Sequence, residues 1–324
     1  MGYIDLHCDT LMQFAKQTNQ NSLLMSDKQV DLIKLKKGGA DAQFFAIFPP
    51  GPEFYKWQKI QPIPTEEYIS RLYSAFLEEL ANNSDYIRFA GSYTDYVENK
   101  KKGLISAFLT LEDGKFIDGK IEKLQQLHND GFRLVTLTWN YENCFGFPNS
   151  DNREIMHKGL KKFGIEAVER MNDMGMIIDV SHLSDGGFYD VAKHSKKPFT
   201  ASHSNARSVC SHPRNLTDEM IKIIADKGGI IGINFGPDFV DEKPIDKKST
   251  IKGIIRHMKY MKKIGGIECI AIGTDFDGIM GTQQIKDASD IPLLIEALQK
   301  EGFQQSEIEK ITYENAERFL KEVI

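Results

Sequence analysis

The chain alternates short, almost entirely apolar runs with longer amphipathic stretches, and eight such runs occur along its length. They cover 3–7, 42–48, 105–111, 133–138, 176–180, 199–202, 229–234 and 270–273. Several, such as ISAFLTL at 105–111, show no alternation of polar and apolar residues, which is typical of parallel strands covered on both faces. Most runs are followed by a stretch long enough to cross back to the next parallel strand.

The intervening stretches favour one fold class. Helical periodicity is clearest at 65–80, 160–174, 217–227, 251–264 and 306–323. Eight strand–helix units favour a (β/α)8 TIM barrel over an open doubly wound sheet, which is the alternative fold. A chain of 324 residues suffices for one such barrel, and no linker or solenoid repeat divides it. We therefore expect a single domain over residues 1–324 with extended loops.

Three segments have the composition of long barrel loops. They are 49–64 with five prolines, 140–152 rich in asparagine, and 236–249 with two prolines. Each follows an expected strand, so each should lie on the face where barrel enzymes build their active sites.

The composition excludes several classes of partner. Lys and Arg number 41 against 46 Asp and Glu, a net charge of −5, and no basic stripe is interleaved with aromatic residues. We therefore expect no nucleic-acid partner. No basic and apolar leader opens the sequence and its last residues read as an amphipathic helix, so we expect no membrane partner and a cytoplasmic location. The four cysteines lack CxxC spacing, which fits reduced thiols.

Side chains that bind metals follow four of the expected strands. His7 and Asp9 form a His-x-Asp pair at the end of the first strand, and alternation along the strand turns both the same way. Asp5 is expected on that face too, either as a group that supports the ligands from behind or as a buried structural aspartate. Glu112 follows the run 105–111, His182 follows 176–180 and His203 follows 199–202. No role is assigned to four other histidines, His128, His157, His194 and His257. Five nitrogen and oxygen ligands exceed one tetrahedral zinc and suit two Zn²⁺ per chain sharing a carboxylate.

Two further residues near the same strand ends have the chemistry of catalysis and substrate binding. Asp275 ends the last strand, where a carboxylate could accept a proton from the attacking water and return it to a leaving amine. Asp277, two residues further out, is the better loop or cap residue. Arg214, eleven residues past His203, is a suitable fork for a substrate carboxylate, and Arg207 and His212 compete for that role.

Six segments together resemble the renal (membrane) dipeptidase family. They are IDLHCDT at 4–10, GGADAQFF at 38–45, LTLE at 109–112, DVSH at 179–182, SHSNARSVCSHPRN at 202–215 and GTDFDG at 273–278. The resemblance implies a metal-dependent barrel of amidohydrolase type holding two zinc ions. It further implies that His7 and Asp9 bind one ion, that His182 and His203 bind the other, and that Glu112 bridges them. By the same resemblance Arg214 binds the C-terminal carboxylate of a dipeptide and Asp275 handles the proton.

The sequence departs from the family pattern at one position. Mammalian members carry a histidine that contacts the scissile carbonyl oxygen where this chain has Trp139, followed by Asn140. Either Asn140, Asn143 or a metal ion polarises that oxygen here, or turnover is lower.

The sequence therefore predicts a zinc dipeptidase in which a hydroxide bridging the two ions attacks the peptide bond, with Glu112 and Asp275 as catalytic residues. The resemblance adds that a D-residue at the C-terminal position is tolerated. The main alternative is another binuclear-metal amidohydrolase, acting on an amide, lactam or lactone without need of Arg214. A silent metal-binding protein would have lost a ligand, and a nucleotide-binding oxidoreductase would carry a glycine fingerprint after the first strand. A homodimer remains open as the assembly.

Overall fold

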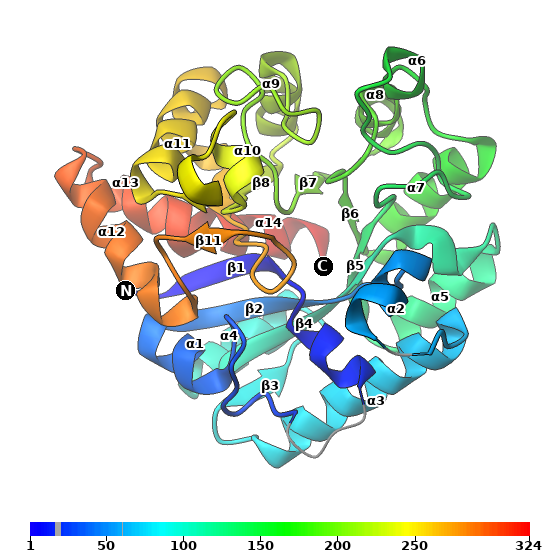
Figure 1. Cartoon of the computed structure of the whole chain (residues 1–324), viewed down its shortest axis with the longest axis horizontal. Coiled ribbons are helices and arrows are strands. Elements are labelled where there is room, and N and C mark those ends of the chain that lie inside the picture. Colours follow the sequence, from blue (N-terminus) through cyan, green and yellow to red (C-terminus); the bar gives the residue numbers. More distant parts are fainter. Residues whose placement is uncertain (17–20, 60) are drawn as a thin grey trace.

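The computed structural model describes residues 1–16, 21–59 and 61–324, and a closed barrel of eight parallel strands lies at its centre (Figure 1). The barrel strands are β1 (Tyr3–Cys8), β2 (Ala40–Ile47), β4 (Ile105–Glu112), β5 (Phe132–Thr136), β6 (Ile177–Asp179), β7 (Thr200–Ala201), β8 (Ile230–Ile233) and β10 (Ile270–Ile272). Each pairs in parallel with its neighbours, and the β2–β4 and β1–β10 pairings complete the circle. The predicted TIM barrel is confirmed, and the open sheet is excluded.

Helices surround the barrel (Figure 1). They are α1 (Leu32–Gly38), α2 (Pro52–Gln58), α3 (Thr65–Asn82), α4 (Tyr93–Lys101), α5 (Ile121–Asn129), α6 (Arg153–Met156), α7 (Lys162–Met174), α8 (Asp185–His194), α9 (Asp218–Asp226), α10 (Pro237–Val240), α11 (Ile251–Gly265), α12 (Ile291–Lys300), α13 (Gln305–Glu309) and α14 (Asn315–Val323). Side-chain caps start several of them: Thr217 accepts from the Met220 amide at α9, and Thr250 accepts from Gly253 at α11. Among the described residues no helix is long and apolar enough to cross a bilayer.

Three short strands lie outside the predicted pattern. β3 (Ile87–Phe89) pairs with the edge of β4, and β9 (Lys248–Ser249) pairs with β11 (Thr282–Gln283) in a separate small sheet. β3 has three residues and its central Arg88 is exposed, so it forms no apolar run. Pairing with β4, rather than local composition, makes this segment a strand.

The predicted helix 306–323 is interrupted. A π-helical turn, Lys310–Glu314, separates α13 from α14. Within it the Thr312 hydroxyl donates to the Ile308 carbonyl, and just after it the Asn315 side chain donates to the carbonyls of Ile267 and Ile270. A tertiary contact of this kind cannot be inferred from the helical period.

An apolar cluster of buried side chains, the axial plug, fills the barrel at the N-terminal ends of its strands. Side chains from β1, β2, β4, β5, β6, β8 and β10 join one cluster, which is possible only on the barrel axis. Phe44 stacks on Phe108 with ring centroids 4.7 Å apart, and Phe319 and Leu320 of α14 belong to the same cluster. Polar side chains are therefore gathered at the opposite end, where the strands finish.

Candidate functional site

The chemistry-bearing residues lie at the carboxyl ends of five barrel strands. His7 lies near the end of β1, Glu112 ends β4, His182 follows β6, His203 follows β7 and Asp275 follows β10. A register shift between Asp5 and Cys8 bends β1 just before the site. The shift explains how both Leu6, in the axial plug, and His7, at the polar end, reach the barrel interior.

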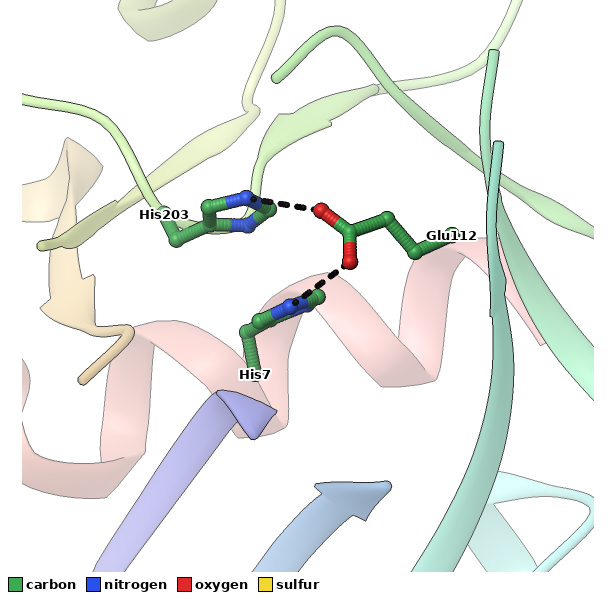
Figure 2. A group of neighbouring side chains, drawn as sticks. All are labelled: His7, Glu112 and His203. Atoms are coloured by element: carbon green, nitrogen blue, oxygen red, sulfur yellow. Dashed lines mark ion pairs between the residues drawn. The ribbon is translucent and has the colours of Figure 1, made fainter. Parts of the chain in front are cut away.

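Glu112 lies between two histidines, and each of its oxygens faces a different one (Figure 2). His7 Nε2 is 3.6 Å from Oε2, whereas His203 Nε2 is 3.5 Å from Oε1. The rings of His7 and His203 stack with centroids 3.9 Å apart. A carboxylate that offers one oxygen to each of two groups has the geometry of a bridging ligand.

The remaining candidate ligands divide between these two oxygens. His182 Nε2 lies 3.2 Å from Glu112 Oε1 and 3.1 Å from His203 Nε2. On the other side His7 Nε2 lies 3.5 Å from Asp9 Oδ2 and 3.8 Å from Asp275 Oδ1. The ligand atoms form two groups able to hold a metal ion, His7 with Glu112 and His203, and His7 with Asp9 and Asp275.

Buried polar atoms in this cluster lack hydrogen-bond partners among the described residues. They are both ring nitrogens of His7 and Oδ1 of Asp9. Buried polar groups are normally satisfied, and an imidazole and a carboxylate are ordinary ligands of divalent metals. The residues present therefore fit a metal centre.

Burial and charge set the protonation of the histidines. Burial, followed by the nearby charges of Arg214 and His7, lowers the pKa of His182 well below its usual value, and burial with the same neighbours does so for His203. Both rings are thus neutral and able to offer a lone pair. Burial opposes the charged form of His7 as well, but Glu112 and Asp9 raise the pKa of His7 well above normal.

The pKa values of two carboxyl groups in the cluster, Glu112 and Asp275, are raised. Burial and the charge of Asp9 raise the pKa of Glu112. Burial also raises the pKa of Asp275, although His7 and Arg214 oppose the shift. Several carboxylates packed this closely repel one another, and a bound cation would relieve that repulsion.

Two site residues adopt backbone conformations that L-residues rarely use. His182 has φ +66° and Asp275 has φ +61°. The His182 carbonyl accepts from the amide and side chain of Asn149 at 2.7 and 3.0 Å and from Thr138 Oγ1 at 3.2 Å. Surrounding contacts thus hold a strained conformation that aims the imidazole at Glu112.

One close approach requires glycine. A Cβ atom at Gly278 would collide with Oδ2 of Asp9. The segment after β10 can therefore pass this close to Asp9 only with glycine at this position.

Arg214 is buried beside His203, and only 6% of its surface is exposed. Nη1 donates to Ser204 Oγ and Nη2 donates to the His203 carbonyl, both at 2.9 Å. Nε has no partner, and no ion pair joins Arg214 to a carboxylate within the described parts of the chain. Since a guanidinium carries five N–H donors, this charge retains the capacity to bind an anion.

The two other residues considered for carboxylate binding are already engaged. Arg207 binds both carboxylate oxygens of Asp185, at 2.7 and 2.8 Å. His212 Nδ1 accepts from the backbone amide of Arg214, so it shapes the turn that carries that residue.

Asp275 and Asp277 have different surroundings. Asn234 donates through Nδ2 to Asp275 Oδ2 at 2.7 Å, which leaves Oδ1 on the side of His7. Asp277 accepts from Thr10 Oγ1 at 2.6 Å and from the amide of Gln29 at 2.8 Å, so it fastens loops together.

Trp139 stands where the mammalian members carry a histidine, and Asn140 follows it at the edge of the site. Trp139 lies 4.7 Å from Phe48 and 6.2 Å from His182, measured between ring centroids. Asn140 Oδ1 lies 3.0 Å from His182 Nδ1. Asn143 donates to Asp113 and to the Leu137 carbonyl, so its amide holds the loop.

Three polar residues at strand ends contact the site without having been singled out from the sequence. They are Asn234, Ser202 and Asp179, which contact Asp275, His203 and Ser202 respectively. Asn234 and Ser202 close apolar runs and Asp179 is the one charged residue inside its run, and these signals could have found them. Asp5 is buried and accepts from the amide of His7 at 3.4 Å and from the amide and hydroxyl of Thr274 at 2.9 and 2.7 Å. It thereby fixes the residue that precedes Asp275.

Sequence comparison identifies relatives along the whole chain. Residues 1–324 match the membrane dipeptidase family, peptidase family M19. An uncharacterised protein in the pqqA 5′ region of Klebsiella pneumoniae is 34% identical over 257 residues, 77% of this chain and 94% of that protein. An uncharacterised dipeptidase of Schizosaccharomyces pombe is 28% identical over 289 residues, 88% of this chain and 68% of that protein.

Solved structures share the fold. A metallo peptidase from Rhodobacter sphaeroides, liganded with a phosphinate mimic of the dipeptide L-Ala-D-Ala, superposes with a TM-score of 0.90 at 24% identity, covering 100% of this chain and 99% of that one. The dipeptidase AC, a metallo peptidase of family M19, superposes with a TM-score of 0.88 at 26% identity, covering 100% of this chain and 98% of that one.

Proposed function

Since the chain belongs to the membrane dipeptidase family, peptidase family M19, it is a metallo-dipeptidase, and we propose that its substrates are dipeptides with a free C-terminal carboxylate. One observation carries this proposal. Arg214 is a buried cation next to the candidate metal centre, and it has no carboxylate partner among the described residues. Burying a charge that forms no direct ion pair is costly, so the site favours an anionic group of the substrate.

The geometry around Arg214 suits a carboxylate near the bond to be cut. Two of its five N–H groups are used by Ser204 and His203, so three remain, Nε–H among them. Charge-assisted hydrogen bonds from these donors would hold the substrate's C-terminal carboxylate. The bond to be cut, one residue before that carboxylate, would then lie at the proposed metal ligands. A longer peptide places extra residues between its carboxylate and the metal centre, so tripeptides should be poor substrates.

We further propose that the metal centre holds two Zn²⁺. His7 and Asp9 would bind one ion, His182 and His203 the other, and Glu112 would bridge them, as its two differently directed oxygens allow. When bound, zinc supplies a water of lowered pKa and polarises the scissile carbonyl.

The protein's own groups then handle protons and orientation. Asp275, held by Asn234 through one oxygen, accepts a proton from the attacking water through the other and returns it to the departing amine. Arg214 would hold the substrate carboxylate and so orient the peptide carbonyl toward the residues that would hold the ions. Glu112 is the second catalytic carboxylate, because it would bridge the two ions at which the reaction takes place. Asn140 has an amide NH₂ group that can contact the substrate.

A D-residue should be accepted at the C-terminal position. Arg214 would hold the carboxylate of the C-terminal residue, and the side chain of that residue could then point in either direction. The Rhodobacter sphaeroides metallo peptidase of the same fold was solved with a mimic of L-Ala-D-Ala, which supports this view.

We place the protein in the cytoplasm. Cys8, Cys144, Cys210 and Cys269 are all free thiols in the structure, as a reducing compartment would keep them.

A direct test compares the wild-type enzyme on a dipeptide, its D-C-terminal isomer, the matching tripeptide and the dipeptide amide. We expect hydrolysis of both isomers and little action on the other two compounds. Equal rates on the dipeptide and its amide would contradict the role of Arg214 and favour a broader amidohydrolase.

A further inference from the structure

We propose that Ser202 and Asp179 are positioning residues that fix the tautomer of His203, so that the lone pair of its Nε2 always faces the metal centre. The inference rests on the proposed function, in which His203 is a metal ligand. It assigns a role to two buried residues that neither bind substrate nor ligate metal.

The three side chains form a continuous hydrogen-bonded chain. Ser202 Oγ lies 2.7 Å from His203 Nδ1 and 2.6 Å from Asp179 Oδ2. All three residues are fully buried. This chain of hydrogen bonds links the proposed ligand His203 to the carboxylate of Asp179, and solvent reaches none of its members.

The direction of each proton in this chain follows from counting donors. A carboxylate accepts hydrogen bonds only, and a serine hydroxyl has a single proton. At 2.6 Å from Asp179 Oδ2, that proton must lie between the two oxygens, because otherwise their lone pairs would face each other. Ser202 Oγ can then only accept from the ring, so His203 carries its proton on Nδ1.

Asp179 is held rigidly enough to serve as the fixed end. Besides Ser202 Oγ, it accepts from Thr136 Oγ1 at 2.7 Å and from the amides of Ser181 and Ser202, both at 2.9 Å. These donors come from β5 and from the segments after β6 and β7. The carboxylate therefore joins three neighbouring strand ends beneath the metal centre.

The consequence appears at the other ring nitrogen. With the proton on Nδ1, the neutral ring presents a lone pair at Nε2, which lies 3.5 Å from Glu112 Oε1 and 3.1 Å from His182 Nε2. In the opposite tautomer an N–H would point at the position of the ion. Partners behind metal-binding histidines commonly contribute 10- to 100-fold in metal affinity.

The surroundings distinguish His203 from the other two histidines. His182 contacts the exposed Asn140 through Nδ1, and the Nδ1 atom of His7 has no hydrogen-bond partner in the described parts of the chain. Of the three, His203 is thus the one whose tautomer is set by a buried carboxylate. We expect the ion bound by His203 to be the more sensitive to changes behind the ligands.

The test uses Ser202→Ala with Thr136→Val as its matched control. Both changes remove one hydroxyl donor from the same oxygen of Asp179, but only Ser202→Ala breaks the link to His203. Zinc affinity is measured on the full chain by chelator competition, and ¹⁵N-histidine NMR of the metal-free protein reports which ring nitrogen carries the proton.

In the wild type we expect His203 protonated at Nδ1. Ser202→Ala should lose this single tautomer and bind zinc about 10- to 100-fold more weakly, whereas Thr136→Val should keep both properties. Ser202→Thr, which restores a hydroxyl, should recover the affinity.

Two results would overturn the proposal. One is an Nε2-protonated His203 in the wild type, which needs no variant to fold. The other is unchanged zinc affinity and unchanged tautomer in Ser202→Ala. If His203→Ala also left zinc binding unchanged, the proposed ligand set would be wrong, and the NMR result alone would decide the tautomer.

Discussion

Arg214 donates from Nη2 to the backbone carbonyl of His203 at 2.9 Å, so the proposed substrate anchor is attached directly to a proposed metal ligand. This hydrogen bond fixes the separation of the two groups directly, rather than through the ten residues of loop between them. Since this separation decides how far a bound carboxylate lies from the reacting bond, the contact favours short substrates of one length.

Replacing Arg214 by lysine should reduce discrimination between a dipeptide and its C-terminal amide. Lysine keeps the charge but cannot form the planar fork, and loss of a charged hydrogen bond costs about 1.5–3 kcal/mol. We expect kcat/KM for the dipeptide to fall about tenfold or more, with little change for the amide. Arg207→Lys is the control, since Arg207 is paired with Asp185 and should leave the ratio unchanged. A ratio equally altered in both variants would argue against the anchor.

Zinc analysis should separate the bridging ligand from a terminal one. The wild type should contain close to two zinc ions per chain. Glu112→Gln should weaken both sites, because its two oxygens face the two ligand groups, whereas His203→Ala should mainly empty one. His194→Ala, a histidine away from the site, serves as the control. A single ion in active wild-type enzyme would contradict this arrangement.

The alternation of apolar runs and helices was enough to predict the barrel, because burial of strands on both faces leaves a direct trace in composition. The same runs located the candidate ligands, since a polar residue that closes an apolar strand has no place in core packing. His7, Glu112 and His203, which are far apart in sequence, indeed meet at one end of the barrel.

Other features depend on contacts that no local pattern encodes. The register shift after Asp5 separates that residue from His7, although strict alternation would place both on one face. Ser202 and Asp179 gain their significance from each other and from Thr136, 43 residues before Asp179. Arg207 and Arg214 look alike in the sequence, and only the position of Asp185 distinguishes them.

Asp275→Asn should lower kcat by about 10²- to 10⁴-fold, the usual range for loss of a general acid–base group. Zinc content decides what the loss means, because Asp275 Oδ1 is also 3.8 Å from His7 Nε2. Near-normal zinc would indicate proton transfer, and loss of one ion would indicate a ligand. Asp277→Asn, which changes a loop-fastening carboxylate, should affect folding stability more than kcat.

Asn140→Ala should weaken zinc binding at the His182 side while leaving the preference for a free carboxylate intact. Asn140 Oδ1 lies 3.0 Å from His182 Nδ1 and so favours the tautomer with the proton on Nδ1. The lone pair of Nε2 then faces Glu112. Because Asn140 is exposed and water can replace its oxygen, we expect a smaller loss than for Ser202→Ala. Chelator competition on the two variants side by side measures the difference, and equal losses would contradict it.

His257 should make the fold sensitive to mild acid. Its ring is fully buried, Nδ1 accepts from the Ala206 amide at 3.1 Å, and Nε2 donates to the Val240 carbonyl at 3.0 Å, so it joins the loop that carries Arg214 to α10. Burial lowers the pKa of His257 to about 4, whereas the unfolded chain should titrate near about 6.5. Between these values the unfolded state binds more protons.

The stabilisation from neutral His257 is therefore complete above about pH 6.5 and is lost as the pH falls toward 4, by up to about 3 kcal/mol. His257→Gln keeps a donor and an acceptor but cannot titrate. Denaturant unfolding of both proteins from pH 7.5 to 4.5 should show the wild type more stable at neutral pH and its advantage shrinking on acidification. The paired measurement matters because Glu112 and Asp275, whose pKa values burial also raises, titrate in both proteins. A constant difference in the free energy of unfolding would show that His257 is not the acid-sensitive link.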